Sequence, residues 1–139
     1  TKKKMTEKQV TGFTCGAFDL LHAGHVLMLK QASQHCDFLI VGLQTDPSID
    51  RKEKNSPSQS IYERFVQLSA IRYVDQIIPY DTEDSLMEIL NSTHIDIRFV
   101  GEEYKSKKFT GQDLPIKIFF TDRKHSFSSS ELRKRVTIS

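Results

Sequence analysis

Short apolar runs alternate along the chain with segments whose apolar residues recur at helical spacing. The apolar runs, which predict strands, cover residues 10–15, 37–43, 76–79, 97–100 and 116–120. The segments with helical spacing cover residues 24–36, 61–70, 84–90 and 128–136. The run at 37–43 is almost continuously apolar, as expected of a strand that is buried on both faces of a parallel sheet. The alternation therefore predicts an α/β fold with an open, doubly wound parallel sheet.

The ends of the predicted strands indicate where a ligand would bind. In sheets of this kind, ligands bind beyond the carboxyl ends of the strands. That rule points to three segments of the chain, Gly16–His25, Gly101–Tyr104 and Arg123–Ser130. Two polar and charged stretches, residues 47–60 and 105–112, predict long loops beside them.

Composition adds limits to this picture. The 139 residues suit one domain, which we place at residues 10–139 after a flexible segment at 1–9. A net charge of +2 does not favour a nucleic-acid or membrane-surface partner, and no apolar run approaches the roughly 20 residues of a membrane span. We find no secretory signal and expect a cytoplasmic protein. Cys15 and Cys36 lack metal-ligand spacing, and they are typical of reduced core thiols.

The most informative chemistry lies where the first predicted strand gives way to the first helix. Gly16 lets the backbone approach a ligand closely, and His22 and His25 stand on either side of Gly24 at the helix start. A helix N-terminus attracts phosphate through its free N–H groups and its dipole. Two imidazoles three residues apart reach the same face and donate hydrogen bonds to phosphate oxygens. This suits a reaction whose transition state builds charge on a phosphoryl group.

Two other readings of the histidine pair are a zinc site and ordinary surface histidines. Zinc requires a third or fourth ligand, and neither the cysteines nor His35, His94 and His125 stand in a recognisable zinc pattern. The position of the pair directly after a strand and Gly-x-Phe-Asp favours the phosphate-binding reading.

A second candidate phosphate site precedes the last predicted helix. Ser128 to Glu131 has the pattern of a capping box, which accounts for one hydroxyl. Arg123 and the three consecutive serines Ser128, Ser129 and Ser130 exceed what one cap needs. Arginine offers a planar fork and serine its hydroxyl, so with Lys124 they suit the β- and γ-phosphates of a nucleotide.

Gly16–His25 resembles the first motif of the cytidylyltransferase-like nucleotidyltransferases, most of all the bacterial glycerol-3-phosphate cytidylyltransferases. The resemblance runs from about Val10 to Val136 and implies a Rossmann-like parallel sheet. It implies direct transfer of a nucleotide with release of pyrophosphate, in which His22 and His25 stabilise the α-phosphate. Mg²⁺ would be bound mainly through the nucleotide phosphates, without a set of protein ligands. Family members usually carry threonine where this chain has Ala17.

The same resemblance implies roles for further residues. The segment that begins at Arg123 is similar to the family's Arg-Thr-Glu-Gly-Ile-Ser-Thr-Thr motif, and Arg123 would be catalytic. Lys52, also catalytic, and Lys54 would hold the acceptor phosphate, whereas the alternative for either lysine is a solvated charged loop. Asp19 would either contact the metal or order its loop. The implied nucleotide-binding residues are Gly16, Ala17, Phe18, Asp19, His22, Gly24, His25, Arg64, Gly101, Glu103, Tyr104, Arg123, Ser128, Ser129 and Ser130.

Two further segments resemble family motifs. Gly101–Tyr104 is similar to Gly-Asp-Asp-Trp and would frame the nucleobase, although adjacent carboxylates are also common surface charge. Arg72–Asp75 resembles a motif at the family's dimer interface that also supports the histidine loop, so we expect a homodimer through residues Arg72, Tyr73, Val74 and Asp75.

The predicted function is transfer of CMP from CTP to a phosphorylated small molecule, with glycerol 3-phosphate as the leading acceptor by resemblance. Choline phosphate is less favoured because a quaternary ammonium requires an aromatic cage and the tyrosines are scattered. Two alternatives stay open: an adenylyltransferase that uses ATP on a sugar phosphate or a related acceptor, and a nucleotide-binding regulatory protein without turnover.

Overall fold

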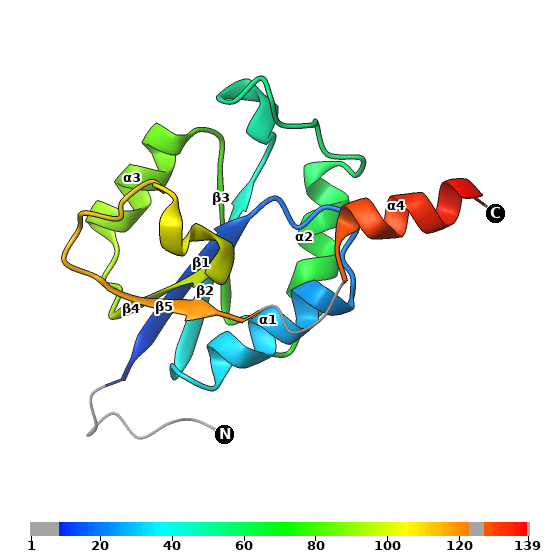
Figure 1. Ribbon diagram of the computed structural model, residues 1–139. Coiled ribbons are helices and arrows are strands. Elements are labelled where there is room, and N and C mark those ends of the chain that lie inside the picture. The colour runs from blue at the N-terminus through cyan, green and yellow to red at the C-terminus, as the bar shows by residue number, and fades with distance from the viewer. Residues whose placement is uncertain (1–8, 123–126, 139) are drawn as a thin grey trace.

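A five-stranded parallel sheet forms the centre of the computed structural model, which describes residues 9–122 and 127–138. The strand order is β3-β2-β1-β4-β5 (Figure 1). The strands are β1 (Thr11–Gly16), β2 (Phe38–Gln44), β3 (Gln76–Tyr80), β4 (Ile97–Gly101) and β5 (Lys117–Thr121). Every pair of neighbouring strands is parallel. The predicted α/β fold is confirmed.

Helices cover both faces of the sheet (Figure 1). Those that cover it are α1 (Ala23–Ser33), α2 (Ile61–Ser69) and α3 (Glu83–Ser92), whereas α4 (Ser129–Ile138) extends away from the sheet. One core cluster joins the sheet to α1 and α2 through Leu29 and Leu68, and the other joins it to α3 through Leu86 and Leu90. Two separate cores, one on each face, are the consequence of the doubly wound order. No helix among the described residues is long and apolar enough to span a membrane.

The predicted elements agree with the observed ones to within a few residues. The main difference concerns the first helix, which ends at Ser33 with Gln34 as its C-cap, and not at Cys36. Cys36 lies beyond the helix, and its thiol packs so close to Gly12 of β1 that a larger residue at position 12 would collide with it. Short 3₁₀ turns at Pro47–Ile49 and Glu102–Ser106 lie in or next to the two predicted loops, and the polar composition of these loops did not predict the turns.

The strand register brings the carboxyl ends of the strands to one edge of the sheet. Gly16 at the end of β1 pairs with Leu43 of β2, and Gly101 at the end of β4 pairs with Thr121 of β5. α1 begins only seven residues after β1 ends, so its N-terminus also lies at this edge. The edge therefore collects the segments that the sequence marks as ligand-binding.

Candidate active site

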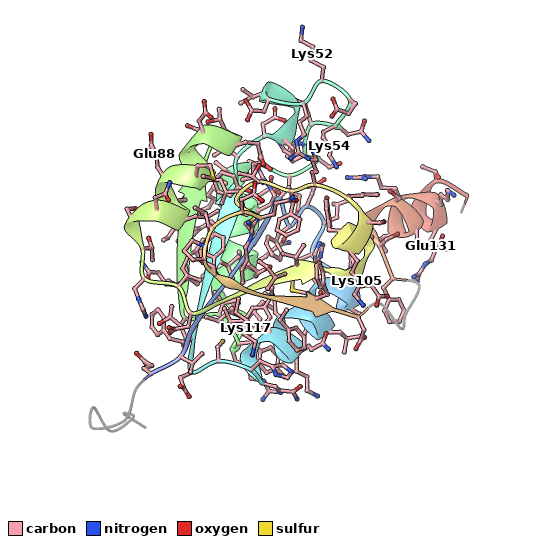
Figure 2. All side chains as sticks on the ribbon, turned by 60° about the vertical axis from the view of Figure 1, so that its left-hand side comes forward. Lys52, Lys54, Glu88, Lys105, Lys117 and Glu131 are labelled. Carbon is pink, nitrogen blue, oxygen red and sulfur yellow. The ribbon has the colours of Figure 1, made fainter. Side chains whose placement is uncertain are left out.

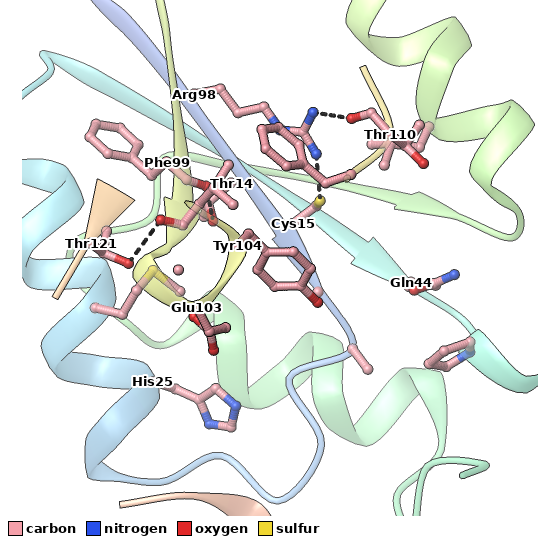
Figure 3. Close-up of a pocket in the computed structure, with 18 of the residues that line it drawn as sticks. Thr14, Cys15, His25, Gln44, Arg98, Phe99, Glu103, Tyr104, Thr110 and Thr121 are labelled. Carbon is pink, nitrogen blue, oxygen red and sulfur yellow. Dashed lines mark hydrogen bonds between the residues drawn. The ribbon is translucent and has the colours of Figure 1, made fainter. Parts of the chain in front are cut away.

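A cavity of about 490 Å³ opens at the carboxyl edge of the sheet (Figure 3). Its walls come from the ends of β1 and β4, the start of α1, the 3₁₀ turn after β4 and the segment that leads into α4. Of the residues predicted from the sequence, those that line it are Gly16, Ala17, His22, Gly24, His25, Lys54, Gly101, Glu103, Tyr104 and Ser128. The fold thus gathers three separate sequence motifs around one space.

His22 and His25 cap the first turn of α1 with their own rings. His22 is the N-cap, and its Nδ1 accepts a hydrogen bond of 3.0 Å from the N–H of Gly24. The Nδ1 of His25 accepts one of 3.1 Å from the N–H of His22, and the two ring centroids are 4.0 Å apart. Because both Nδ1 atoms act as acceptors, each neutral ring carries its proton on Nε2. The pair therefore offers two Nε2–H donors at a helix N-terminus.

His25 is held in the neutral form. Burial and, to a smaller extent, the charge of neighbouring His22 together lower the pKa of His25 to about 4, against the raising effect of Asp19. A neutral imidazole still donates through Nε2 to a phosphate oxygen. The site can therefore bind and polarise a phosphoryl group without carrying two imidazolium charges at neutral pH.

This arrangement predicts the pH dependence of stability. The unfolded chain binds a proton at this histidine below about pH 6.5, whereas native His25 does so only near pH 4. Between those values the unfolded state binds more protons, so the free energy of unfolding falls as the pH is lowered. NMR titration of the ring carbons should place His25 near pH 4, and urea melts of His25→Asn should lose that part of the slope. A native midpoint at or above 6.5 would contradict the burial argument.

The loop from β1 to α1 has an unusual backbone. Phe18 and Leu20, neither of them glycine, both have a φ of 51° in the left-handed region. The carboxylate of Asp19 between them accepts hydrogen bonds of 2.8 Å and 2.9 Å from the N–H groups of Ser58 and Gln59. Strained backbone of this kind persists only where its surroundings over-determine it, and it concentrates at functional sites. Of the two roles that the sequence leaves open for Asp19, the structure supplies the ordering of the loop.

Arg64, predicted among the phosphate ligands, is not part of the cavity lining. Its side chain is only 2% exposed. The guanidinium donates to the carbonyl oxygens of Gln59 (3.1 Å), Ala17 (2.9 Å) and Gln44 (2.6 Å), and also to that of Thr45. These bonds join the histidine loop to the end of β2, so Arg64 shapes the site from behind it.

Other predicted residues also lie away from the cavity lining. Lys52 is exposed and points away from the molecule, whereas Lys54 lies against it (Figure 2). Phe18 is buried in the core cluster that contains Leu29 of α1, with its ring centroid 5.4 Å from that of His25. Ser130 is exposed on α4 and is not part of the lining. Arg123 lies outside the described residues, as does the side chain of Ser129.

The start of α4 is tied to the histidine loop by a residue that the sequence pattern did not identify. The guanidinium of Arg133 donates to the Asp19 carboxylate at 2.7 Å. At the N-terminus of α4, the hydroxyl of Ser128 accepts from the N–H of Glu131 at 3.0 Å, which is half of the predicted capping box. Spacing along the chain contains no signal for Arg133, since its partner is 114 positions away.

A polar half of the cavity was also missed. It is formed by Cys15, Tyr80, Glu83, Arg98 and Thr110, with Arg51 at its margin. One signal for it exists in the sequence, because Arg98 interrupts an otherwise apolar strand. A charged residue in a buried strand is expected to have a partner or a function.

Comparisons with known proteins cover most of the chain. A family model described as cytidylyltransferase-like matches residues 13–135. Two similar curated proteins are both named bifunctional protein HldE. The one from Campylobacter jejuni subsp. jejuni serotype O:6 is 34% identical over 98% of this chain and 29% of its own length. The one from Paramagnetospirillum magneticum is 41% identical over 76% of this chain and 22% of its own length. The chain thus spans less than a third of the relatives that it matches.

Two solved structures share the fold. The lipopolysaccharide core biosynthesis protein from Thermoplasma volcanium superposes with a TM-score of 0.60 at 21% identity, over 94% of this chain and 88% of that one. The pantothenate synthetase from Thermus thermophilus gives 0.59 at 12% identity, over 92% and 64%.

Proposed function

Because the chain belongs to the cytidylyltransferase-like family, we propose that it is a nucleotidyltransferase, which transfers a nucleoside monophosphate from a nucleoside triphosphate to a phosphorylated small molecule. The observation that carries this proposal is the pair of Nε2–H donors at the N-terminus of α1, on the wall of the cavity. The start of α4, with Ser128, lines the same cavity and supplies a second helix N-terminus.

The proposed step is an in-line displacement. An oxygen of the acceptor phosphate attacks the α-phosphorus, and a new P–O bond forms while the bond to the bridging oxygen of the β-phosphate breaks. Pyrophosphate leaves with the electron pair of that bond. No protein nucleophile is required, since positioning and charge stabilisation suffice for phosphoryl chemistry. His22 and His25 would donate to the α-phosphate oxygens as charge builds on them.

Mg²⁺ fits the donor chemistry of the cavity only as an ion held mainly by nucleotide phosphates. The described residues contain no group of three or more His, Cys, Asp or Glu side chains that could hold a metal. The carboxylates of Glu103 and Asp122 line the cavity singly and offer oxygen atoms of the kind that Mg²⁺ prefers. When bound, the ion would neutralise part of the phosphate charge.

Two nucleotides are candidates. CTP is favoured by the sequence resemblance, with glycerol 3-phosphate as the leading acceptor. ATP with a sugar phosphate is the second candidate. It gains weight because the relatives reported above are named bifunctional protein HldE, and none of those names refers to a cytidylyltransferase.

Pyrophosphate release measured with each of the four nucleoside triphosphates tests the proposal. Each nucleotide would be paired with a panel of phosphorylated alcohols and sugars, and with no acceptor as the control. We expect pyrophosphate release with one of the two candidate nucleotides, CTP or ATP, and only when a phosphorylated acceptor is present. Tight nucleotide binding by calorimetry, without release for any pair, would favour the regulatory alternative.

We also propose that the protein is a homodimer through α2 and the segment Arg72–Asp75. Tyr62, Phe65 and Val66 of α2 expose large apolar side chains, and Phe65 lines a shallow groove together with Val74. The edge strand β3 contributes Ile77 to the same groove, so apolar side chains lie beside the edge of the sheet that the described residues form. Asp75 itself faces inward, because its carboxylate accepts from the N–H of Leu39 at 2.8 Å.

Arg72→Ala should weaken the dimer and lower kcat together. The Arg72 guanidinium lies 5.3 Å from the ring of Tyr73, and truncation of an interface arginine can cost about 2 kcal/mol or more. Sedimentation across a range of concentrations, paired with the pyrophosphate assay, measures both effects. Lys117→Gln, at an exposed position on β5, is the control. A wild-type protein that is monomeric and fully active at assay concentrations would refute the dimer.

A further inference from the structure

The cavity has two chemically different halves on opposite faces of the sheet. His22 and His25 belong to α1, which packs on one face, whereas Cys15 and Tyr80 pack with the core cluster of α3 on the other. His25 and Arg98 lie on opposite sides of the cavity (Figure 3). If the nucleotide phosphates occupy the helix N-termini on the α1 side, the α3 side remains for the acceptor. We name Cys15, Tyr80, Glu83, Arg98 and Thr110 the inner polar cluster.

Arg98 is a buried cation without a counter-ion. Its side chain is 4% exposed, and no carboxylate forms an ion pair with it among the residues that the structure describes. One terminal nitrogen donates to the carbonyl of Thr110, and the other lies 3.9 Å from the sulfur of Cys15. The Nε is buried and has no hydrogen-bond partner. The guanidinium also lies 5.0 Å from the centre of the Phe109 ring, a contact that supplies no counter-charge.

The only acid within the inner polar cluster is already occupied. The Glu83 carboxylate accepts from Arg51 at 3.1 Å, from the hydroxyl of Thr110 at 2.7 Å and from the amide of Gln44 at 3.3 Å. The Arg51–Glu83 ion pair is therefore neutral as a unit. The charge of Arg98 is what remains in this half of the cavity.

The groups beside Arg98 are neutral. Burial raises the pKa of the Cys15 thiol and that of the Tyr80 hydroxyl, so both keep their protons at neutral pH. Tyr80 is only 5% exposed. The thiol and the phenol hydrogen-bond to each other, and the guanidinium beside them keeps a buried Nε–H without a partner, so this half of the cavity matches a negatively charged group with acceptor oxygens.

We propose that Arg98 binds an oxyanion of the acceptor substrate, so that the inner polar cluster selects acidic acceptors. The inference rests on the proposed transferase function. A buried charge is costly unless it is paired, and a bound phosphate or carboxylate would supply the missing partner. A purely structural role, in which Arg98 holds the loop of Thr110 over the cavity, would use the bond to that carbonyl and the stacking of the guanidinium 5.0 Å from the Phe109 ring, but neither contact neutralises the charge.

The test compares the wild type with Arg98→Gln and Arg98→Lys, using glycerol 3-phosphate and 3-phosphoglycerate as probes. In Arg98→Gln, the KM for the acceptor should rise about tenfold or more, since a charge-assisted hydrogen bond contributes about 1.5–3 kcal/mol. The KM for the nucleoside triphosphate should stay within about twofold. Arg98→Lys should recover part of the loss because it restores the charge. Lys117→Gln controls for the loss of one positive charge at an exposed site.

The two probes distinguish the source of the oxyanion. Equal losses for both acceptors would place the attacking phosphate of the acceptor at Arg98, and a loss with 3-phosphoglycerate alone would place its carboxylate there. Unchanged acceptor KM values, or an equal rise for the nucleotide, would overturn the proposal. Calorimetric binding of 3-phosphoglycerate to wild type and Arg98→Gln, both shown to be folded by thermal melts, separates this result from the transferase reaction. If no pair of nucleotide and acceptor releases pyrophosphate, the proposed transferase function is wrong. The difference in 3-phosphoglycerate affinity between wild type and Arg98→Gln then decides alone whether Arg98 binds an oxyanion.

Discussion

Replacing His22 or His25 by Asn is expected to lower kcat by about a hundredfold or more, with a smaller loss in nucleotide affinity. Removing one preorganised donor to a developing oxyanion costs about 10²–10³ in kcat in comparable sites. The Nε2–H of each ring is the donor, because its Nδ1 is used by the helix cap. Pyrophosphate release at saturating substrates measures kcat, and calorimetry measures nucleotide affinity.

The asparagine variants are chosen because they separate chemistry from folding. An Asn oxygen can replace Nδ1 as the cap acceptor, whereas alanine would also remove the cap at a cost of about 1 kcal/mol. His94, which is exposed and 3.0 Å from Asp96, provides the matched control, and His94→Asn should leave kcat unchanged. If both active-site variants keep the wild-type kcat, the proposed role of the histidines in phosphoryl transfer is wrong.

Arg64→Met is expected to lower the free energy of unfolding by about 3 kcal/mol or more. The substitution leaves the carbonyls of Ala17, Gln44, Gln59 and Thr45 without their donor, and one unpaired buried carbonyl costs about 1–3 kcal/mol. Thermal unfolding should shift by on the order of 10 °C. Urea melts followed by circular dichroism measure the change directly.

The activity of the same variant distinguishes the structural role of Arg64 from the role that the sequence suggested. At a temperature where the variant is folded, we expect kcat to fall, because the histidine loop loses its anchor at Ala17. The KM for the nucleotide should change less than it would if Arg64 bound a phosphate directly. Arg64→Lys should remain destabilised, since one ammonium cannot reach four carbonyl oxygens. Arg135→Met, at an exposed site on α4, should change stability by no more than about 0.5 kcal/mol.

Local patterns were sufficient to predict most of the architecture. Strands such as Phe38–Gln44 are recognisable because a strand buried on both faces must be apolar at consecutive positions. The histidine pair was predictable for a similar reason, because both rings interact with the backbone within three residues of their own positions. Chemistry that a helix end and its neighbours perform locally is visible in the sequence.

The tertiary structure alone decided which charged residues face the cavity. Arg64 and Arg98 both carry a guanidinium, yet Arg64 is used on backbone carbonyls and Arg98 lines the cavity without a counter-ion among the described residues. Lys52 and Lys54 are two positions apart, and only Lys54 reaches the lining. The hydrogen-bond partners of such charged side chains are distant in the sequence. Thr110 is 12 positions from Arg98, and Asp19 is 114 positions from Arg133. A long side chain can point either way from its backbone, and the direction is set by distant carbonyls and carboxylates that only the folded sheet brings within reach.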